Sequence, residues 1–211
     1  MNNLNSRLKK YNDNLNLTFG DITGKYEPFT DKFTNDDYIK LKKSIQDIHN
    51  ILTLKLTLNF IETIGELFNF PKGITQKLKV ESDEISPNAR GFDIKIDNPT
   101  KILAEVKCIT PENEKDRFNA AQKKNLFKDA IKLKLKEHSF NTEDYYKFIV
   151  ILDFGTSTDE AIEAILKYDS KKLNNEREDR MTVLKHLIYL TDNWNKNDLD
   201  KSKIYIVKQK L

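Results

Sequence analysis

The stretch from Gly91 to Cys108, GFDIKIDNPTKILAEVKC, decides the fold of this chain. Two short apolar segments, residues 92–96 and 101–108, stand on either side of the turn-forming sequence Asp97-Asn98-Pro99. Apolar segments of this length bounded by such residues are typical of strands, and a short connection between them is typical of a hairpin. The sequence therefore predicts a β-hairpin at this place.

The second segment of the hairpin carries charge on one face only. Successive side chains of a strand point to opposite faces of the sheet. Glu105 and Lys107 are thus expected on one face, and Ala104, Val106 and Cys108 on the other. Cys108 is for this reason predicted to be a core residue rather than a nucleophile.

Asp93, on the first segment, can lie beside Glu105, because neighbouring strands are only about 5 Å apart. Mg²⁺ needs just one or two protein carboxylates, with water and phosphate oxygens as its other ligands. Lys107 would then orient, or help to deprotonate, a metal-bound water that attacks phosphorus. An ordinary hairpin held by salt bridges would have the same residues, because an aspartate followed at a distance by Glu-x-Lys is a loose pattern.

A strongly basic helix is predicted after the hairpin, over residues 115–137. From Lys115 to Lys136 the chain has eight basic and two acidic residues, although its overall net charge is only +3. Lysines recur every four residues in this helix and therefore form one row along it; they are Lys124, Lys128, Lys132 and Lys136. The row is either a solvated face or a ridge that contacts the phosphates of a nucleic acid.

The spacing of apolar residues predicts the remaining elements. In chain order these are a helix from Asn35, its N-cap, to Pro71, either continuous or broken near Leu54; a strand at 76–81; a buried strand at 146–152; helices at 159–167 and 178–194; and a last strand at 203–208. Residues 1–34 are Asn-rich and are expected to form an arm or irregular lead-in with one short helix at most. Residues 35–211 are then a single α/β (mixed α+β) domain with a central mixed β-sheet flanked by helices.

Composition excludes several classes of protein. The 211 residues are 38% hydrophobic, which is enough for a core, yet no apolar run approaches the roughly 20 residues of a membrane span. The single cysteine rules out an intrachain disulfide, and the six glycines form no phosphate-binding loop, which excludes P-loop and Rossmann proteins. Asp153-Phe154-Gly155 matches a kinase triplet by chance, because the other kinase motifs are missing. With no signal-peptide pattern at its start, the chain is expected to be cytoplasmic and to have no membrane partner.

The order of the elements resembles that of the PD-(D/E)xK nuclease superfamily, to which many restriction endonucleases and DNA resolvases belong. The resemblance covers about residues 55–152: a helix with glutamates, the hairpin with Gly91-Phe92-Asp93 and Ala104-Glu105-Val106-Lys107, the basic helix and the buried strand. Phe92 is a departure, because the name of the family expects proline there. The resemblance implies a restriction-endonuclease-like core, with residues 157–211 as an extension for recognition or dimerisation.

The resemblance also implies the residues of the site. The expected Mg²⁺ ligands are Asp93, Glu105, Glu62 and the backbone carbonyl of Val106. Lys107 would serve the water nucleophile and complete the catalytic set, and Glu66 is the alternative to Glu62. The expected DNA contacts are Arg90, Gln122 and the row Lys124, Lys128, Lys132 and Lys136.

The function that the resemblance implies is Mg²⁺-dependent hydrolysis of phosphodiester bonds in double-stranded DNA, leaving 5′-phosphates. A sequence-specific type II restriction endonuclease is the first choice, because the chain has elements beyond the common core and no helicase motif. Such an enzyme is expected to be a homodimer, since two-fold symmetry matches a palindromic site, and to have a cognate methyltransferase. Two alternatives stay open: a Holliday-junction or repair nuclease of the same fold that reads DNA shape, and a non-catalytic nucleic-acid-binding protein in which the three charged residues form a salt bridge.

Overall fold

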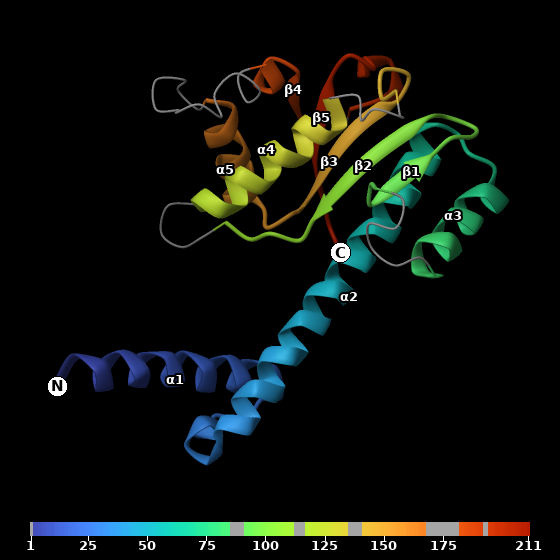
Figure 1. Cartoon of the computed structure of the whole chain (residues 1–211). Coiled ribbons are helices and arrows are strands. Elements are labelled where there is room, and N and C mark those ends of the chain that lie inside the picture. The colour runs from blue at the N-terminus through green and yellow to red at the C-terminus, as the bar shows by residue number, and fades with distance from the viewer. Residues whose placement is uncertain (1, 85–90, 112–116, 135–140, 168–181, 192–193) are drawn as a thin grey trace. The chain divides into compact units, whose positions relative to one another are not determined.

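A computed structural model of the chain (Figure 1) describes residues 2–84, 91–111, 117–134, 141–167, 182–191 and 194–211. The chain divides into two compact units, residues 1–49 and 50–211. Among the described residues, no helix combines the length and the apolar character that a membrane span requires.

The first unit is a small helical assembly. It contains α1 (Asn2–Thr23), the short 3₁₀ helix η1 (Phe29–Lys32) and the beginning of α2 (Asn35–Leu67). The ring of Phe19 meets those of Phe29 and Phe33 edge to face, with centroids 5.7 and 5.9 Å apart. These aromatic contacts give the unit a small apolar centre of its own.

Two predictions for this region are wrong. Residues 1–34 do not form an irregular arm, because α1 alone is a helix of 22 residues. The prediction rested on the Asn-rich composition and did not take into account the apolar residues that recur at helical spacing, such as Leu8, Leu15 and Phe19. The cap of α2 is Thr34 rather than Asn35: Thr34 Oγ1 accepts a hydrogen bond from the Asp37 amide at 3.3 Å, and Asp37 Oδ2 accepts one from the Thr34 amide at 2.9 Å.

The second unit is built on a mixed sheet, as the sequence predicts, and this sheet has five strands. Its strands are β1 (Ile94–Ile96), β2 (Ile102–Lys107), β3 (Tyr146–Leu152), β4 (Leu187–Leu190) and β5 (Ile204–Gln209), in the order β1-β2-β3-β5-β4. The predicted hairpin is confirmed, because β1 pairs antiparallel with β2, and all the other pairs are parallel. The carboxyl ends of β2, β3, β5 and β4 therefore meet at one edge of the sheet.

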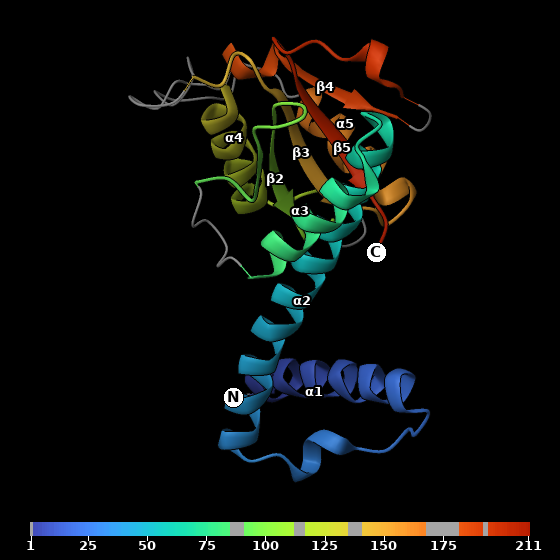
Figure 2. The same ribbon diagram turned by 90° about the vertical axis from the view of Figure 1, so that its right-hand side faces the viewer.

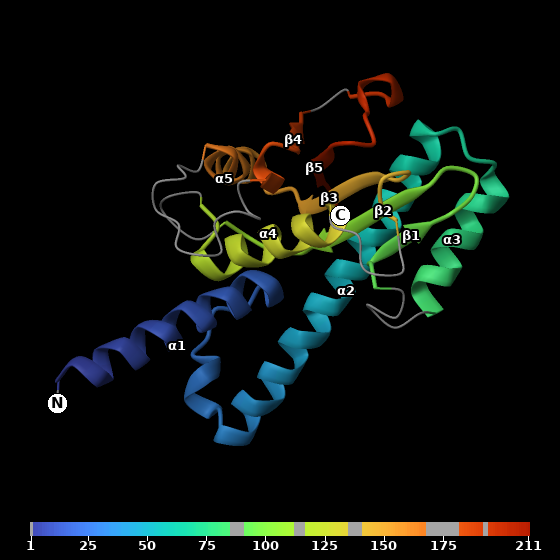
Figure 3. The ribbon, with the colours of Figure 1, turned by 45° about the horizontal axis from the view of Figure 1, so that its top comes forward.

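Helices cover both faces of this sheet (Figures 2 and 3). One face packs on the part of α2 from Leu56 to Leu67 and on α3 (Lys72–Glu84), and its core includes Phe60, Ala104 and Phe148. The other face packs on α4 (Ala120–Lys134) and α5 (Thr156–Leu166). The alternation predicted for β2 is confirmed, because Ala104, Val106 and Cys108 belong to the α2 side of the sheet, together with Ile102.

Two further predicted elements differ from the structure. Residues 76–81 are part of α3 and not a strand, because Ile74 and Leu78 pack on the core at helical spacing. Residues 187–190 are the strand β4, whereas a helix was expected over 178–194; residues 178–181 and 192–193 of that range lie outside the described residues. The spacing of Val183, Leu187 and Leu190 fits a helix, but Leu187–Leu190 instead pairs with β5.

Candidate active site at the carboxyl end of the parallel strands

Three of the four residues predicted to form the catalytic centre, Asp93, Glu105 and Lys107, come together at the carboxyl end of β2. Glu105 is only 2% exposed and Lys107 is the last residue of the strand. Asp93 directly precedes β1, and its Oδ2 accepts a hydrogen bond of 2.7 Å from the Val106 amide. This bond holds the Asp93 carboxylate against β2 at the level of Glu105, as the hairpin prediction requires.

Two residues of α4 complete the cluster, and the sequence did not predict this role for either. Lys132 Nζ lies 2.6 Å from Glu105 Oε1, and Lys107 Nζ lies 3.7 Å from Glu105 Oε2 and 3.0 Å from Asp129 Oδ2. Asp129 and Lys132 are one turn apart, so both reach the same face of the helix. The sequence feature that could have identified Asp129 is its position between Phe127 and Ala130, two apolar residues of a helix that packs on the sheet. A carboxylate at such a position is expected to be partly buried.

Burial and charge set the protonation of the cluster. Burial and the nearby Asp93 carboxylate raise the pKa of Glu105 to about 7, against the opposing effect of Lys132 and Lys107. Burial raises the pKa of Asp129 as well. Burial alone would lower the pKa of Lys107, but the carboxylates of Asp129 and Glu105 outweigh it, and the pKa is raised. Lys107 is therefore an ammonium ion at neutral pH, while Glu105 titrates close to neutrality.

The donor set fits a hard divalent cation. Asp93 and Glu105 supply carboxylate oxygens, which are the ligands that Mg²⁺ prefers, and two such groups are enough when water and phosphate provide the rest. Among the residues that the structure describes, no group of three or more His, Cys, Asp or Glu side chains is placed to hold a metal ion.

The helical glutamates lie elsewhere. Glu62 is 58% exposed and forms an ion pair of 2.7 Å with Lys79 of α3. α2 packs on the face of the sheet opposite to the one that carries Glu105. Glu66, the alternative, is exposed on the same helix. Within the described residues, no observed contact joins either glutamate to Asp93 or Glu105, and a role for either in metal binding stays a prediction.

Gln122 begins the basic helix and does not project freely from it. Its Oε1 accepts a hydrogen bond of 2.8 Å from the Asn119 amide, while Asn119 Oδ1 accepts one of 2.8 Å from the Gln122 amide. Gln122 Nε2 also donates to the Thr110 carbonyl at 3.1 Å. This reciprocal pair is a capping box, so the structure gives Gln122 a local role in fixing the start of α4.

Replacing Gln122 with alanine is expected to lower the free energy of unfolding by about 1 kcal/mol, because the Asn119 amide loses its acceptor. Gln122→Glu keeps an acceptor at this position and adds a negative charge near a helix N-terminus, although it loses the donation to the Thr110 carbonyl, so it is expected to destabilise the chain less than Gln122→Ala does. Urea unfolding followed by circular dichroism measures both variants. Equal destabilisation by the two substitutions would contradict the capping role.

The lysine row is interrupted in the structure. Lys124 and Lys128 are exposed on α4, whereas Lys132 turns to Glu105, and its ammonium lies 4.8 Å from the centre of the Phe92 ring. Lys136 and Arg90 lie outside the described residues. Within the described part of the row, Lys124 and Lys128 are thus exposed, and Lys132 links the row to the acidic cluster.

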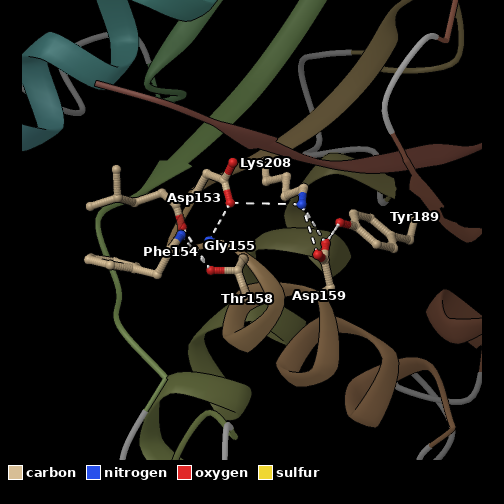
Figure 4. Close-up of polar contacts among 8 residues, drawn as sticks. Asp153, Phe154, Gly155, Thr158, Asp159, Tyr189 and Lys208 are labelled. Carbon is tan, nitrogen blue, oxygen red and sulfur yellow. Dashed lines mark hydrogen bonds and ion pairs between the residues drawn. The ribbon is translucent and has the colours of Figure 1, made fainter.

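A second ionic cluster lies at the same edge of the sheet (Figure 4). Lys208 of β5 lies 2.7 Å from Asp159 of α5 and 3.8 Å from Asp153, and Tyr189 also donates to Asp159. Asp153 Oδ1 accepts a hydrogen bond of 2.8 Å from the amide of Gly155, whose φ is +72°. The kinase-like triplet is thus the turn that leads into α5, and Asp153 has its contacts in this second cluster rather than with the acids of the hairpin.

Comparisons with known proteins add no relative. No protein-family model, no curated protein and no solved structure matches the chain. Any function must therefore be argued from the residues and their geometry.

Proposed function

We propose that the chain is an Mg²⁺-dependent endonuclease that hydrolyses phosphodiester bonds of double-stranded DNA, with a restriction-endonuclease-like core and the role of a sequence-specific type II restriction endonuclease. One observation carries the proposal: the buried carboxylate of Glu105 lies at a sheet edge beside Asp93 and within 3.7 Å of Lys107. Two carboxylates and an ammonium at one point are the groups that metal-assisted hydrolysis of a phosphate needs.

Each group has a chemical task in this proposal. Asp93, Glu105 and the Val106 carbonyl would hold Mg²⁺, which when bound supplies a Lewis acid for a phosphate oxygen. Because its pKa is raised, Lys107 acts as an ammonium that orients water and stabilises negative charge, rather than as a base. Asp129, 3.0 Å from Lys107, positions that ammonium.

The surroundings support a polyanionic substrate. Lys124 and Lys128 are exposed on the helix that also carries Lys132, and lysines contact phosphates as point charges. One such centre per chain would cut one strand, so a homodimer is proposed for cutting both strands. Products with 5′-phosphates and a cognate methyltransferase belong to the same proposal.

A specific observation favours a second candidate, a nucleic-acid-binding protein without catalysis. Glu105, Lys107, Asp129 and Lys132 are already joined to one another by three ion pairs. Such a network also stabilises a fold with no chemistry at all. In that case the exposed lysines would still bind DNA, with a strong dependence on salt concentration.

Incubation of the purified protein with unmethylated plasmid and phage DNA, in Mg²⁺ or in EDTA, tests the proposal. Discrete fragments with Mg²⁺ and intact DNA with EDTA are expected on a gel, and mapping the fragment ends gives the site. Cleavage of branched DNA alone would favour a junction or repair nuclease. Salt-dependent binding without cleavage of any substrate would favour the second candidate.

A further inference from the structure

Lys132 lies against one oxygen of Glu105, the carboxylate that would hold a metal ion under the proposed function. Its ammonium lies 2.6 Å from Glu105 Oε1, closer than the 3.0 and 3.7 Å of the two ion pairs that Lys107 makes. Glu105 is 2% exposed, so water cannot replace a lost counter-charge at low cost. A divalent cation and this ammonium therefore compete for the same carboxylate oxygen.

The contacts of Lys132 also allow it to leave. The side chain is 27% exposed, and it comes from α4, one turn after the exposed Lys128. The stem of a lysine is flexible, and its ammonium is strongly hydrated. The Phe92 ring, 4.8 Å away, gives the ammonium a second favourable contact close by. Exchange requires a change of side-chain conformation, and α4 can keep its packing on the sheet.

We propose that Lys132 is the resident counter-cation of Glu105 and is exchanged for Mg²⁺ when the site is loaded, which frees its ammonium for a DNA phosphate. This inference rests on the proposed function and deepens it, because it couples metal binding at Asp93 and Glu105 to phosphate binding on α4. Electrostatics gives the reason for the coupling: one buried carboxylate oxygen does not hold both cations, and the released ammonium lies on the helix that carries Lys128.

Titration calorimetry with Mn²⁺ alone, in the absence of DNA, measures the competition directly. Lys132→Met removes the ammonium and keeps an apolar stem, so Mn²⁺ is expected to bind about tenfold more tightly than to the unchanged chain, which corresponds to about 1.4 kcal/mol. Lys128→Met, one turn earlier, is expected to leave the Mn²⁺ affinity unchanged. The titrations are run at about pH 8.5, because loss of Lys132 removes a group that favours ionised Glu105.

A second measurement needs no variant. Reductive methylation followed by mass spectrometry compares Lys132 with Lys128 in the unchanged chain. With Mg²⁺, Lys132 is expected to react several-fold faster than without it, because the released amine has lost its ion pair, whereas the rate at Lys128 stays constant. An equal rate at Lys132 with and without Mg²⁺ would overturn the exchange.

The outcomes separate this inference from the proposed function. If Asp93→Asn abolishes Mn²⁺ binding while Lys132→Met binds Mn²⁺ as the unchanged chain does, or more weakly, the exchange is wrong and the metal site stands. If neither the unchanged chain nor Lys132→Met binds Mn²⁺, the metal site itself fails and the exchange fails with it. Absence of DNA cleavage together with tighter Mn²⁺ binding by Lys132→Met would count against the nuclease and support the exchange.

Discussion

Asp93→Asn is expected to reduce Mg²⁺-dependent DNA cleavage by about 10²- to 10³-fold, the range seen when a group that stabilises the transition state is lost. The substitution removes one of the two carboxylates that would hold the metal ion. It keeps the shape of the side chain and an oxygen that can accept the 2.7 Å hydrogen bond from the Val106 amide. The fold should therefore survive while the cleavage rate falls.

Asp93→Ala separates the two roles of this residue. Alanine leaves the Val106 amide without its acceptor, so this variant is expected to lose about 1–2 kcal/mol of unfolding free energy in addition to cleavage. Asp93→Asn is expected to keep the stability of the unchanged chain within about 0.5 kcal/mol. Cleavage rates on mapped substrate and urea unfolding measure the two effects independently.

A matched control comes from the other end of the sheet. Asp144 is an exposed aspartate paired with Lys101 at 3.3 Å, and Asp144→Asn is expected to leave the cleavage rate unchanged. If Asp93→Asn cut DNA at the rate of the unchanged chain, Asp93 would be a structural residue that only anchors β2. A structural ion-pair network without catalysis would then be the better account of the cluster.

Local pattern was enough to predict the elements that position the site. The hairpin and β3 follow from apolar segments of strand length, and β3 (YKFIVIL) is apolar enough to be buried on both faces. Alternation along β2 placed Glu105 and Lys107 on one face without knowledge of any partner strand. These features depend on neighbouring residues, and neighbouring residues are what a sequence shows directly.

Contacts between distant residues were out of reach. Leu187–Leu190 has helical spacing with Val183, and only pairing with β5 makes it a strand. Val80 alternates with Leu78 as in a strand, but it is exposed in α3, and the packing of Ile74 and Leu78 on the core decides the element. In both segments, packing against another element determines whether the residues form a strand or a helix. This packing outweighs the local secondary-structure propensity of the sequence.

The same reason explains what was missed in the site. Regular spacing assigned Lys132 to a row of phosphate contacts, whereas packing of α4 on the sheet brings its ammonium to Glu105, 27 positions earlier in the chain. The residues around Asp129 in the sequence do not indicate that it forms an ion pair with Lys107. Helix periodicity identifies the face on which a residue lies, but the residue it meets there depends on the register between helix and sheet.

The α2 side of the sheet supplies a test of the fold that is independent of any chemistry. Phe148, in the middle of β3, is fully buried. The centroid of its ring lies 5.3 Å from that of Phe60, and 5.9 Å from those of Trp194 and Tyr205. Phe148→Ala removes all of these contacts and leaves a cavity, so the free energy of unfolding is expected to fall by about 3–5 kcal/mol. The melting temperature should then fall by on the order of 10 °C.

Phe154 provides the control for this substitution, because it follows the same strand but is 47% exposed. Phe154→Ala is expected to change stability by no more than about 0.5 kcal/mol, since an exposed ring loses little on truncation. Thermal and urea unfolding of the two variants compare a buried and an exposed phenylalanine six positions apart. Similar stabilities for both variants would mean that the Phe148 side chain is not buried under α2. The assignment of the two faces of the sheet, with Phe148 toward α2 and Glu105 toward α4, would then lose its support.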